Sequence, residues 1–156
     1  MNEKKLLKYA VDYLSKYDSS KVNLVNVLKR KILRLKITNY EKGKLINIIE
    51  SIIIKLEKNK FIDDNRYSST KILSLSNSGK SKNFIFNYLI KKGVNKTQIQ
   101  NNLNSMQQDN DNWELNSSKI FAKKKKLLEK DQSYEKNLAK MARAGFSYDI
   151  CKKILG

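Results

Sequence analysis

The chain has 156 residues, 40% of them hydrophobic, and its 33 lysines and arginines exceed its 15 acidic residues to give a formal net charge of +18. It contains no histidine and one cysteine, Cys151, which excludes imidazole catalysis, the usual zinc sites and an internal disulfide. The charge predicts a polyanionic or acidic partner. AT-rich codon usage, however, would also enrich lysine, asparagine and isoleucine without any role in binding.

No stretch of the sequence has the pattern of an export signal or a membrane span. The N-terminal stretch MNEKKLLKYAVDYL lacks an uninterrupted apolar core followed by small residues. The most apolar stretch, LINIIESIIIKL, is interrupted by Glu50 and Lys55 and is too short to span a bilayer. We therefore expect a cytoplasmic protein in which Cys151 is reduced and buried on the apolar face of its helix.

Helical periodicity begins near the N-terminus. Apolar residues recur at helical spacing over 7–17 and 24–35 and, most regularly, over 44–58. Polar residues that can cap the second of these helices precede it: Asp18, Ser19 and Ser20. Proline is absent and glycine occurs only five times, so the signals typical of strands and hairpins are scarce. The pattern predicts an all-helical fold.

Six further helices are expected along the rest of the chain. Their approximate ranges are 64–77, 82–92, 96–106, 113–130, 138–142 and 148–155. The side chains expected to cap them are Asp63, Ser81, Asn95, either Asp111 or Asn112, and Ser147. The glycines expected in left-handed backbone at helix ends are Gly79, Gly93 and Gly145. The total is about nine helices, which fall into three groups of three.

An internal repeat supports this grouping. YLIKKGVNKTQIQNNL and KMARAGFSYDICKKIL share a helix, a glycine, an apolar residue, a cap and a second helix, so that Gly93 aligns with Gly145. The first group has Lys31 and Ile32 in place of the glycine, so its second helix is expected to run on. We predict three tandem three-helix modules, 4–60, 61–107 and 111–156, that stack because each buries little alone.

Two short motifs each allow two interpretations. Asp63 and Asp64 could form a metal or acid–base pair, but capping and helix-dipole effects explain them without a third acidic ligand. The residues Gly79, Lys80 and Ser81 resemble the end of a phosphate-binding loop, but the upstream glycine and preceding strand are missing. We favour the structural interpretation of both motifs.

Basic and aromatic residues in the last third of the chain are candidates for contacts with a partner. Lys123 to Lys126 span more than one helical turn, so some of their alkyl stems cover the core while others reach solvent or a partner. Arg143 could form one basic edge with Lys152 and Lys153, or all three could be ordinary solvated residues. Tyr148 and Trp113 could stack on exposed bases, although aromatic residues at helix starts more often pack locally.

The chain resembles the RecX family of bacterial regulatory proteins from roughly Lys5 to Leu155, in segments that occur in the same order: FIDDNRYSS, SGKSKNFIFNYLIKKGV, IFAKKKK and ARAGFSYDICKKIL. It departs from the family at Asn137, where an apolar residue is usual, and in the basic run after Phe121, where lysine replaces arginine. The third module is therefore expected to pack or bind somewhat differently.

This resemblance implies an elongated, curved array of modules that binds the RecA filament on single-stranded DNA. The family inhibits filament growth, ATP hydrolysis, strand exchange and co-protease activity, and so modulates recombination and the SOS response. It implies a monomeric regulator that is not an enzyme and needs no cofactor or metal, with RecA as partner and single-stranded DNA as a further contact. The residues expected to contact the filament or DNA are Lys91, Lys92, Lys123, Lys124, Lys125, Lys126, Arg143, Lys152 and Lys153.

The alternative function is non-specific DNA binding of the helix-turn-helix type. LAKMARAGFSYDICKKIL fits a helix, a glycine turn and a second helix that could enter a groove. That second helix offers tyrosine, aspartate and lysine but no arginine, asparagine or glutamine to read base edges. Sequence-specific recognition is therefore not expected.

Overall fold

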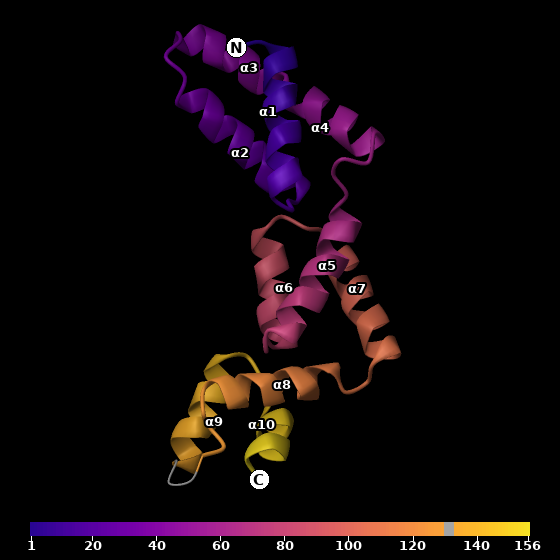
Figure 1. Ribbon diagram of the computed structural model, residues 1–156, viewed down its shortest axis with the longest axis vertical. Helices are drawn as coiled ribbons and strands as arrows, with labels where there is room; N and C mark the ends of the chain where they lie inside the picture. Colours follow the sequence, from indigo (N-terminus) through magenta and orange to yellow (C-terminus); the bar gives the residue numbers. More distant parts are fainter. Residues whose placement is uncertain (130–132) are drawn as a thin grey trace. The chain divides into compact units, whose positions relative to one another are not determined.

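The computed structural model describes residues 1–129 and 133–156, and within them every regular element is a helix (Figure 1). These helices are α1 (Glu3–Lys16), α2 (Lys21–Leu33), α3 (Asn39–Asn47), α4 (Ile49–Lys58), α5 (Asp64–Asn77), α6 (Lys82–Lys91), α7 (Lys96–Asp109), α8 (Trp113–Lys124), α9 (Tyr134–Arg143) and α10 (Tyr148–Leu155). The all-helical fold predicted from the sequence is confirmed.

The chain divides into two compact units. Unit 1 comprises Met1–Tyr67 and Lys92–Val94, and unit 2 comprises Ser68–Lys91 and Asn95–Gly156. The turn between α6 and α7 thus belongs to unit 1, although both helices belong to unit 2. Each unit combines parts of neighbouring helix triplets, and the residue boundaries of the three expected modules stay a prediction.

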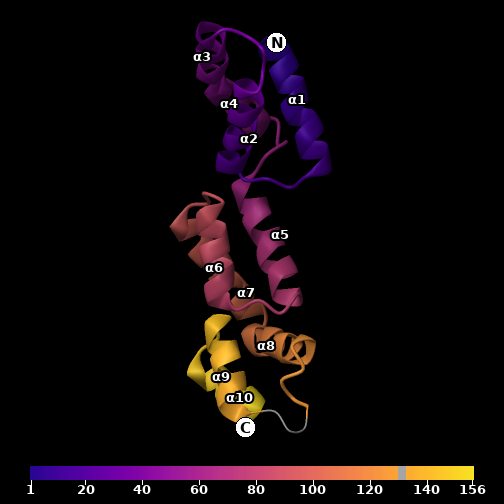
Figure 2. The same ribbon diagram turned by 90° about the vertical axis from the view of Figure 1, so that its left-hand side faces the viewer.

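In unit 1, the helices α1 to α4 lie next to one another (Figure 2), and their buried apolar side chains form one core. The regular spacing of leucine and isoleucine on these helices places one stripe of each helix against the others. The buried residues of this core are Leu6, Ala10, Leu24, Leu28, Ile32, Leu45, Ile49, Ile52, Ile53, Leu56 and Ile62. The apolar pattern that predicted the first three helices therefore also predicted the core of unit 1.

One local expectation for unit 1 is confirmed and another is wrong. The second helix does run on longer: α2 has 13 residues and continues past Lys31 and Ile32, whereas α6 and α9 have 10 each. Thr38 then caps a separate helix by accepting a hydrogen bond from Glu41 N at 3.2 Å. The expected helix over 44–58 is interrupted at Ile48, whose N–H donates to Leu45 O. The Ser51 hydroxyl donates to Ile48 O at 2.8 Å, and such a side-chain bond competes with the helical ladder and bends it.

In unit 2, α6 and α7 bury one apolar set, and α8, α9 and α10 bury another. The first set includes Ile85, Leu89, Ile99 and Leu103. The second consists of Ala122, Leu127, Met141, Phe146 and Cys151. Cys151 is fully buried, as expected, and burial raises the pKa of its thiol.

The seventh helix is shorter than expected. α8 ends at Lys124, and Lys126 has a positive φ of 57°. The left-handed residue reverses the chain so that Leu127 N donates to Ala122 O and the Leu127 side chain enters the core. The expected end near Lys130 lies outside the described residues. Asn137, where the family usually has an apolar residue, is buried and donates from Nδ2 to Leu127 O at 2.9 Å.

A serine at the start of α2 connects distant segments within unit 1. The Ser20 hydroxyl accepts a hydrogen bond from Asn23 N and donates to Lys92 O in the turn before α7. The next amide, Lys21 N, donates to Asp64 Oδ1 at 2.8 Å. We call this arrangement the serine joint of unit 1.

Unit 2 contains the same arrangement at the start of α6. The Ser81 hydroxyl accepts from Phe84 N at 3.0 Å and donates to Ala144 O at 2.8 Å, in the turn before α10. Lys82 N donates to Glu114 Oε2, also at 2.8 Å. This serine joint of unit 2 has the same hydrogen-bond pattern as that of unit 1, which extends the internal repeat from sequence to tertiary contacts.

Candidate functional site

The acidic pair at the start of α5 is structural. Asp63 Oδ1 accepts from the backbone N–H groups of Asn65 and Arg66 at 2.9 and 3.1 Å, and Asp64 accepts from Lys21 N. Burial raises the pKa of the Asp64 carboxyl, and the Lys21 N–H opposes that rise. Across residues 1–129 and 133–156, no three His, Cys, Asp or Glu residues are grouped to hold a metal ion.

The segment from Gly79 to Ser81 is occupied by the chain itself. The Ser81 hydroxyl already donates to Ala144 O, and a Cβ on Gly79 would lie 2.9 Å from Phe121 N. The ammonium group of Lys80 lies 4.6 Å from the centre of the Phe84 ring. This packing favours a structural turn over a phosphate-binding loop.

The four lysines after Phe121 differ in their local contacts. All four residues from Lys123 to Lys126 are exposed. Lys124 Nζ donates to Ser78 O at 3.0 Å, where it stabilises the last turn of α5, and Lys126 forms the left-handed end of α8. Of the two candidate stacking residues, Trp113 is 2% exposed and Tyr148 is 62% exposed, so only Tyr148 is accessible to a base.

Two of the predicted contact residues, Lys91 and Arg143, line one hollow of about 290 Å³ between α6 and the end of α9. We call this the α6/α9 hollow, and its lining consists of Asn83, Phe84, Asn87, Tyr88, Lys91, Arg143, Ala144 and Gly145. None of these residues is acidic, and Phe84 is 39% exposed. Cations, amides and an exposed aromatic ring thus meet on one surface.

The remaining predicted contact residues lie elsewhere. Lys152 and Lys153 line a hollow of about 390 Å³ with Asp149 and Gly156, so Arg143 does not line the same hollow as they do. Lys92 belongs to unit 1, where its carbonyl oxygen accepts from Ser20. The basic edge of Arg143, Lys152 and Lys153 therefore stays a prediction.

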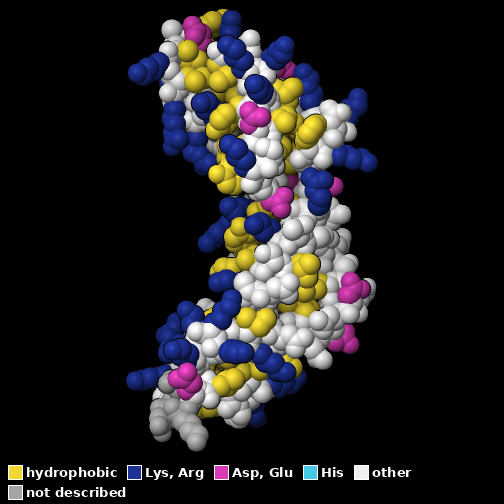
Figure 3. All heavy atoms as spheres, viewed as in Figure 1, with side chains coloured by type: hydrophobic (Ala, Val, Ile, Leu, Met, Phe, Trp, Pro, Cys, Tyr) yellow, Lys and Arg dark blue, Asp and Glu magenta, His cyan; other side chains and the backbone are white. Residues whose placement is uncertain are grey.

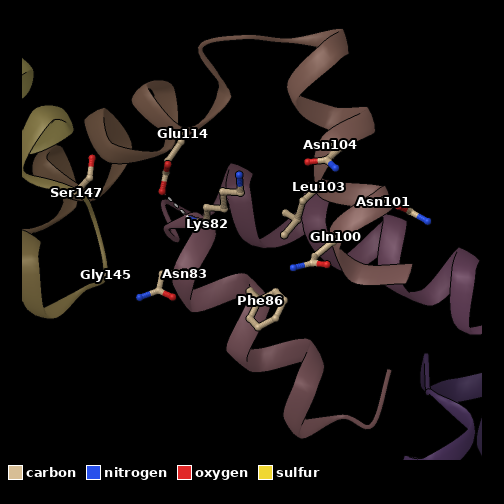
Figure 4. Close-up of a pocket in the computed structure, with 10 residues that line it drawn as sticks. All are labelled: Lys82, Asn83, Phe86, Gln100, Asn101, Leu103, Asn104, Glu114, Gly145 and Ser147. Carbon is tan, nitrogen blue, oxygen red and sulfur yellow. Dashed lines mark hydrogen bonds between the residues drawn. The ribbon is translucent and has the colours of Figure 1, made fainter. Parts of the chain in front are cut away.

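A larger groove of about 680 Å³ borders the serine joint of unit 2 (Figure 4). Phe86 of α6 and Gln100 and Leu103 of α7 face one another across it, with amide side chains around them. Asn83 and Gly145 line both this groove and the α6/α9 hollow. Its one carboxylate, Glu114, accepts from Lys82 N, so the groove contains no pair of acidic groups for acid–base catalysis.

The sequence analysis missed a basic hollow of about 330 Å³ between α1 and α2 in unit 1. Its lining consists of Tyr9, Tyr13, Val27, Arg30, Lys31, Arg34 and Leu35. One signal was available, because two of the chain's four arginines occur four residues apart and so share a helix face. The tyrosines come from another helix, and their proximity could not be read from spacing.

Lysine and arginine side chains are spread over both units, with few carboxylates among them (Figure 3). In the described part of the chain, no helix is both long and apolar enough to cross a membrane. The repeated joints and the cationic hollows define a basic, all-helical protein built from a repeated unit.

No family model matches the chain. The regulatory protein RecX of Myxococcus xanthus (strain DK1622) is 30% identical to it over 154 residues, which cover 94% of this chain and 81% of the relative. The chain therefore belongs to the RecX family of regulatory proteins.

Solved structures agree on the fold. The crystal structure of RecX from Lactobacillus salivarius matches with a TM-score of 0.70 and 22% identity over 97% of this chain and 93% of that chain. A second crystal structure, of regulatory protein RecX, gives 0.69 and 22% over 96% and 70%.

Proposed function

We propose that this protein binds the RecA filament on single-stranded DNA and inhibits its growth, ATP hydrolysis, strand exchange and co-protease activity, thereby modulating recombination and the SOS response. The observation that carries this proposal is the similarity to a regulatory protein RecX over 94% of the chain. The cationic hollows support it, because several modest contacts on one chain raise the overall affinity for a repeating filament without any deep pocket.

The proposal is tested by DNA-dependent ATP hydrolysis of the cognate RecA in the presence of substoichiometric protein. We expect inhibition at ratios far below one molecule per RecA protomer, under salt that abolishes binding to naked DNA. Inhibition that requires enough protein to coat the DNA would contradict the proposal and favour direct DNA binding.

The α6/α9 hollow is the contact surface we propose for this function. The K91A/R143A variant is expected to need severalfold more protein for half-inhibition, because both cations border the same hollow. K152A/K153A is the matched control, since it removes the same charge from a different hollow of unit 2. Equal losses in the two variants would show that only total charge matters and would reject the hollow as the contact.

A second function, non-specific binding of single-stranded DNA, is favoured by the exposed Phe84 ring beside Lys91 and Arg143. Base stacking on an aromatic ring combined with backbone neutralisation suits single strands without sequence preference. Phe84→Ala should then weaken binding to oligothymidylate, because stacking is lost. The change of affinity with salt concentration should stay the same, because the phosphate contacts remain.

A further inference from the structure

The hollow between α1 and α2 differs in composition from the rest of the basic surface. Only four of the chain's 33 basic residues are arginines, yet Arg30 and Arg34 both line this hollow. They lie one turn apart on the same helix face, separated by roughly 6 Å along the axis. We call it the arginine–tyrosine hollow.

Within the described part of the chain, neither guanidinium group has a partner. Among residues 1–129 and 133–156, the side chains of Arg30 and Arg34 make no hydrogen bond or ion pair, and no carboxylate lines the hollow. Their position near the end of α2 favours cations through the helix dipole. A lysine would satisfy the dipole equally, and Lys42 Nζ already donates to Leu33 O there at 2.9 Å. The dipole therefore does not account for two arginines.

Apolar and aromatic side chains lie beside the arginines in the hollow. Val27 is 7% exposed, and Leu35 and both tyrosines are half-buried. Arginine and tyrosine are enriched where protein partners bind most tightly, whereas lysine is depleted there. Paired arginines next to tyrosines and two aliphatic side chains, in a chain otherwise rich in lysine, are typical of a protein-binding surface.

The tyrosine rings are already engaged. Lys31 Nζ lies over the Tyr9 ring, 5.0 Å from its centre, and the rings of Tyr13 and Tyr17 lie 5.0 Å apart. These contacts cover part of the tyrosine rings and so leave less of each ring for stacking on a nucleobase. An anion that also brings an apolar group fits better, because it would contact both the arginines and the apolar side chains beside them.

We propose that the arginine–tyrosine hollow binds an acidic segment of a protein partner. Carboxylates of the segment pair with the planar guanidinium groups of Arg30 and Arg34 through two parallel hydrogen bonds each. An apolar residue next to those carboxylates packs on Val27 and Leu35. The proposal does not require the partner to be RecA, so it stands or fails separately from the function proposed above.

The probe is a short fluorescein-labelled peptide in which pairs of glutamates alternate with single leucines, and the full-length protein is titrated by fluorescence anisotropy. We expect R30A/R34A to bind it roughly tenfold more weakly or worse. R30K/R34K should lose most of the same affinity, since lysine keeps the charge but not the planar fork. K4A/K8A, with the same charge change and spacing on exposed positions of α1, should change binding by less than about twofold.

Several outcomes would overturn the proposal. Wild-type protein that fails to bind the peptide, or R30K/R34K that binds it like wild type, would exclude paired carboxylate recognition. Oligothymidylate that binds more tightly than the peptide and loses its affinity in R30A/R34A would make the hollow a nucleic-acid site. Self-association in sedimentation that R30A/R34A abolishes would make the occupant a second copy of this chain. Unchanged helicity by circular dichroism controls for folding of each variant.

Discussion

The two serine joints share their hydrogen bonds but differ in what surrounds them. In unit 1 a Cβ on Gly93 would lie 2.5 Å from Val22 Cβ, whereas in unit 2 a Cβ on Gly145 would lie 2.5 Å from the Ser81 hydroxyl oxygen. The glycine is thus required at both places by close approach and by a positive φ, of 79° and 97°. Both joints keep the serine cap and the close approach of the glycine to the start of the helix that the serine caps. The side chain that an added Cβ would meet differs between them, Val22 in unit 1 and Ser81 in unit 2.

The lysines that follow the two serines also differ. Lys21 Nζ pairs with Glu57 Oε2 at 2.7 Å, and that hydrogen bond raises the pKa of Lys21. Lys82 has no ion pair in the described residues and lines the groove of unit 2 instead. The lysine after the serine therefore forms an ion pair within unit 1, whereas the corresponding lysine of unit 2 lines an open groove.

The largest expected effect comes from Gly93→Ala. The new methyl would meet Val22 and place a non-glycine residue in left-handed backbone, which should reduce the free energy of unfolding by about 2–5 kcal/mol. Gly145→Ala should cost less, because the Ser81 hydroxyl can rotate away from the new Cβ at the loss of one hydrogen bond. Urea unfolding followed by circular dichroism measures both changes.

A second-site variant separates the two causes at Gly93. Since Val22 Cβ itself is the nearest atom, Val22→Gly and not Val22→Ala is the informative partner. The double variant should recover about 1 kcal/mol or more relative to the sum of the single changes. Strict additivity would mean that backbone strain alone, and not contact with α2, requires the glycine.

The next effect concerns the serines themselves. Ser20→Ala and Ser81→Ala each remove a helix cap and the serine donor to a half-buried carbonyl oxygen, so each should cost about 1–3 kcal/mol. Similar losses in thermal unfolding would support equivalent joints. A loss of stability at one serine and none at the other would show that the two joints share their hydrogen-bond geometry but do not contribute equally to stability.

A smaller effect depends on pH and on Asp64. Because burial raises its pKa in the folded state above the ordinary value of 3.8, the folded protein binds more protons between those two pKa values. Wild type should therefore lose stability as pH rises through that window. Asp64→Asn keeps an oxygen acceptor for Lys21 N without the charge, so its stability relative to wild type should rise over the same window. Urea unfolding at several pH values tests this, and a parallel pH dependence in both proteins would contradict it.

The smallest effect is expected for Glu57→Gln. The side chains of Lys21 and Glu57 are 38% and 50% exposed, and exposed ion pairs contribute about 0–1 kcal/mol. The loss in unfolding free energy should shrink further in high salt. A loss larger than that of Ser20→Ala would mean that the ion pair, and not the serine, holds the joint of unit 1.

Much of the fold could be predicted because its signals are local. The expected caps Ser20, Asp63, Asn95 and Ser147 all accept hydrogen bonds from their own helices. The expected glycine ends are left-handed. The end of α8 was missed because the need to bury Leu127 overrides the helical preference of four consecutive lysines.

The candidate site was predicted less well. Lys91 and Arg143 were named individually, but no pattern in the sequence indicated that they line one hollow, and Arg30 and Arg34 were not recognised as a pair with tyrosines. Such groupings depend on which helices pack together, and residues more than fifty positions apart carry no spacing signal.

The sequence by itself determined most of the helices, several of their caps, the apolar stripes and the repeated glycine turn, because each depends on groups within a few residues of one another. Only the tertiary structure decided which carbonyl oxygen each serine reaches, which acidic residue each following amide meets, and which cations share a surface. Those contacts follow from the packing of helices that are distant in the chain. Packing is driven by burial of apolar area, which is not directional, so the apolar pattern of one helix does not say which other helix will cover it.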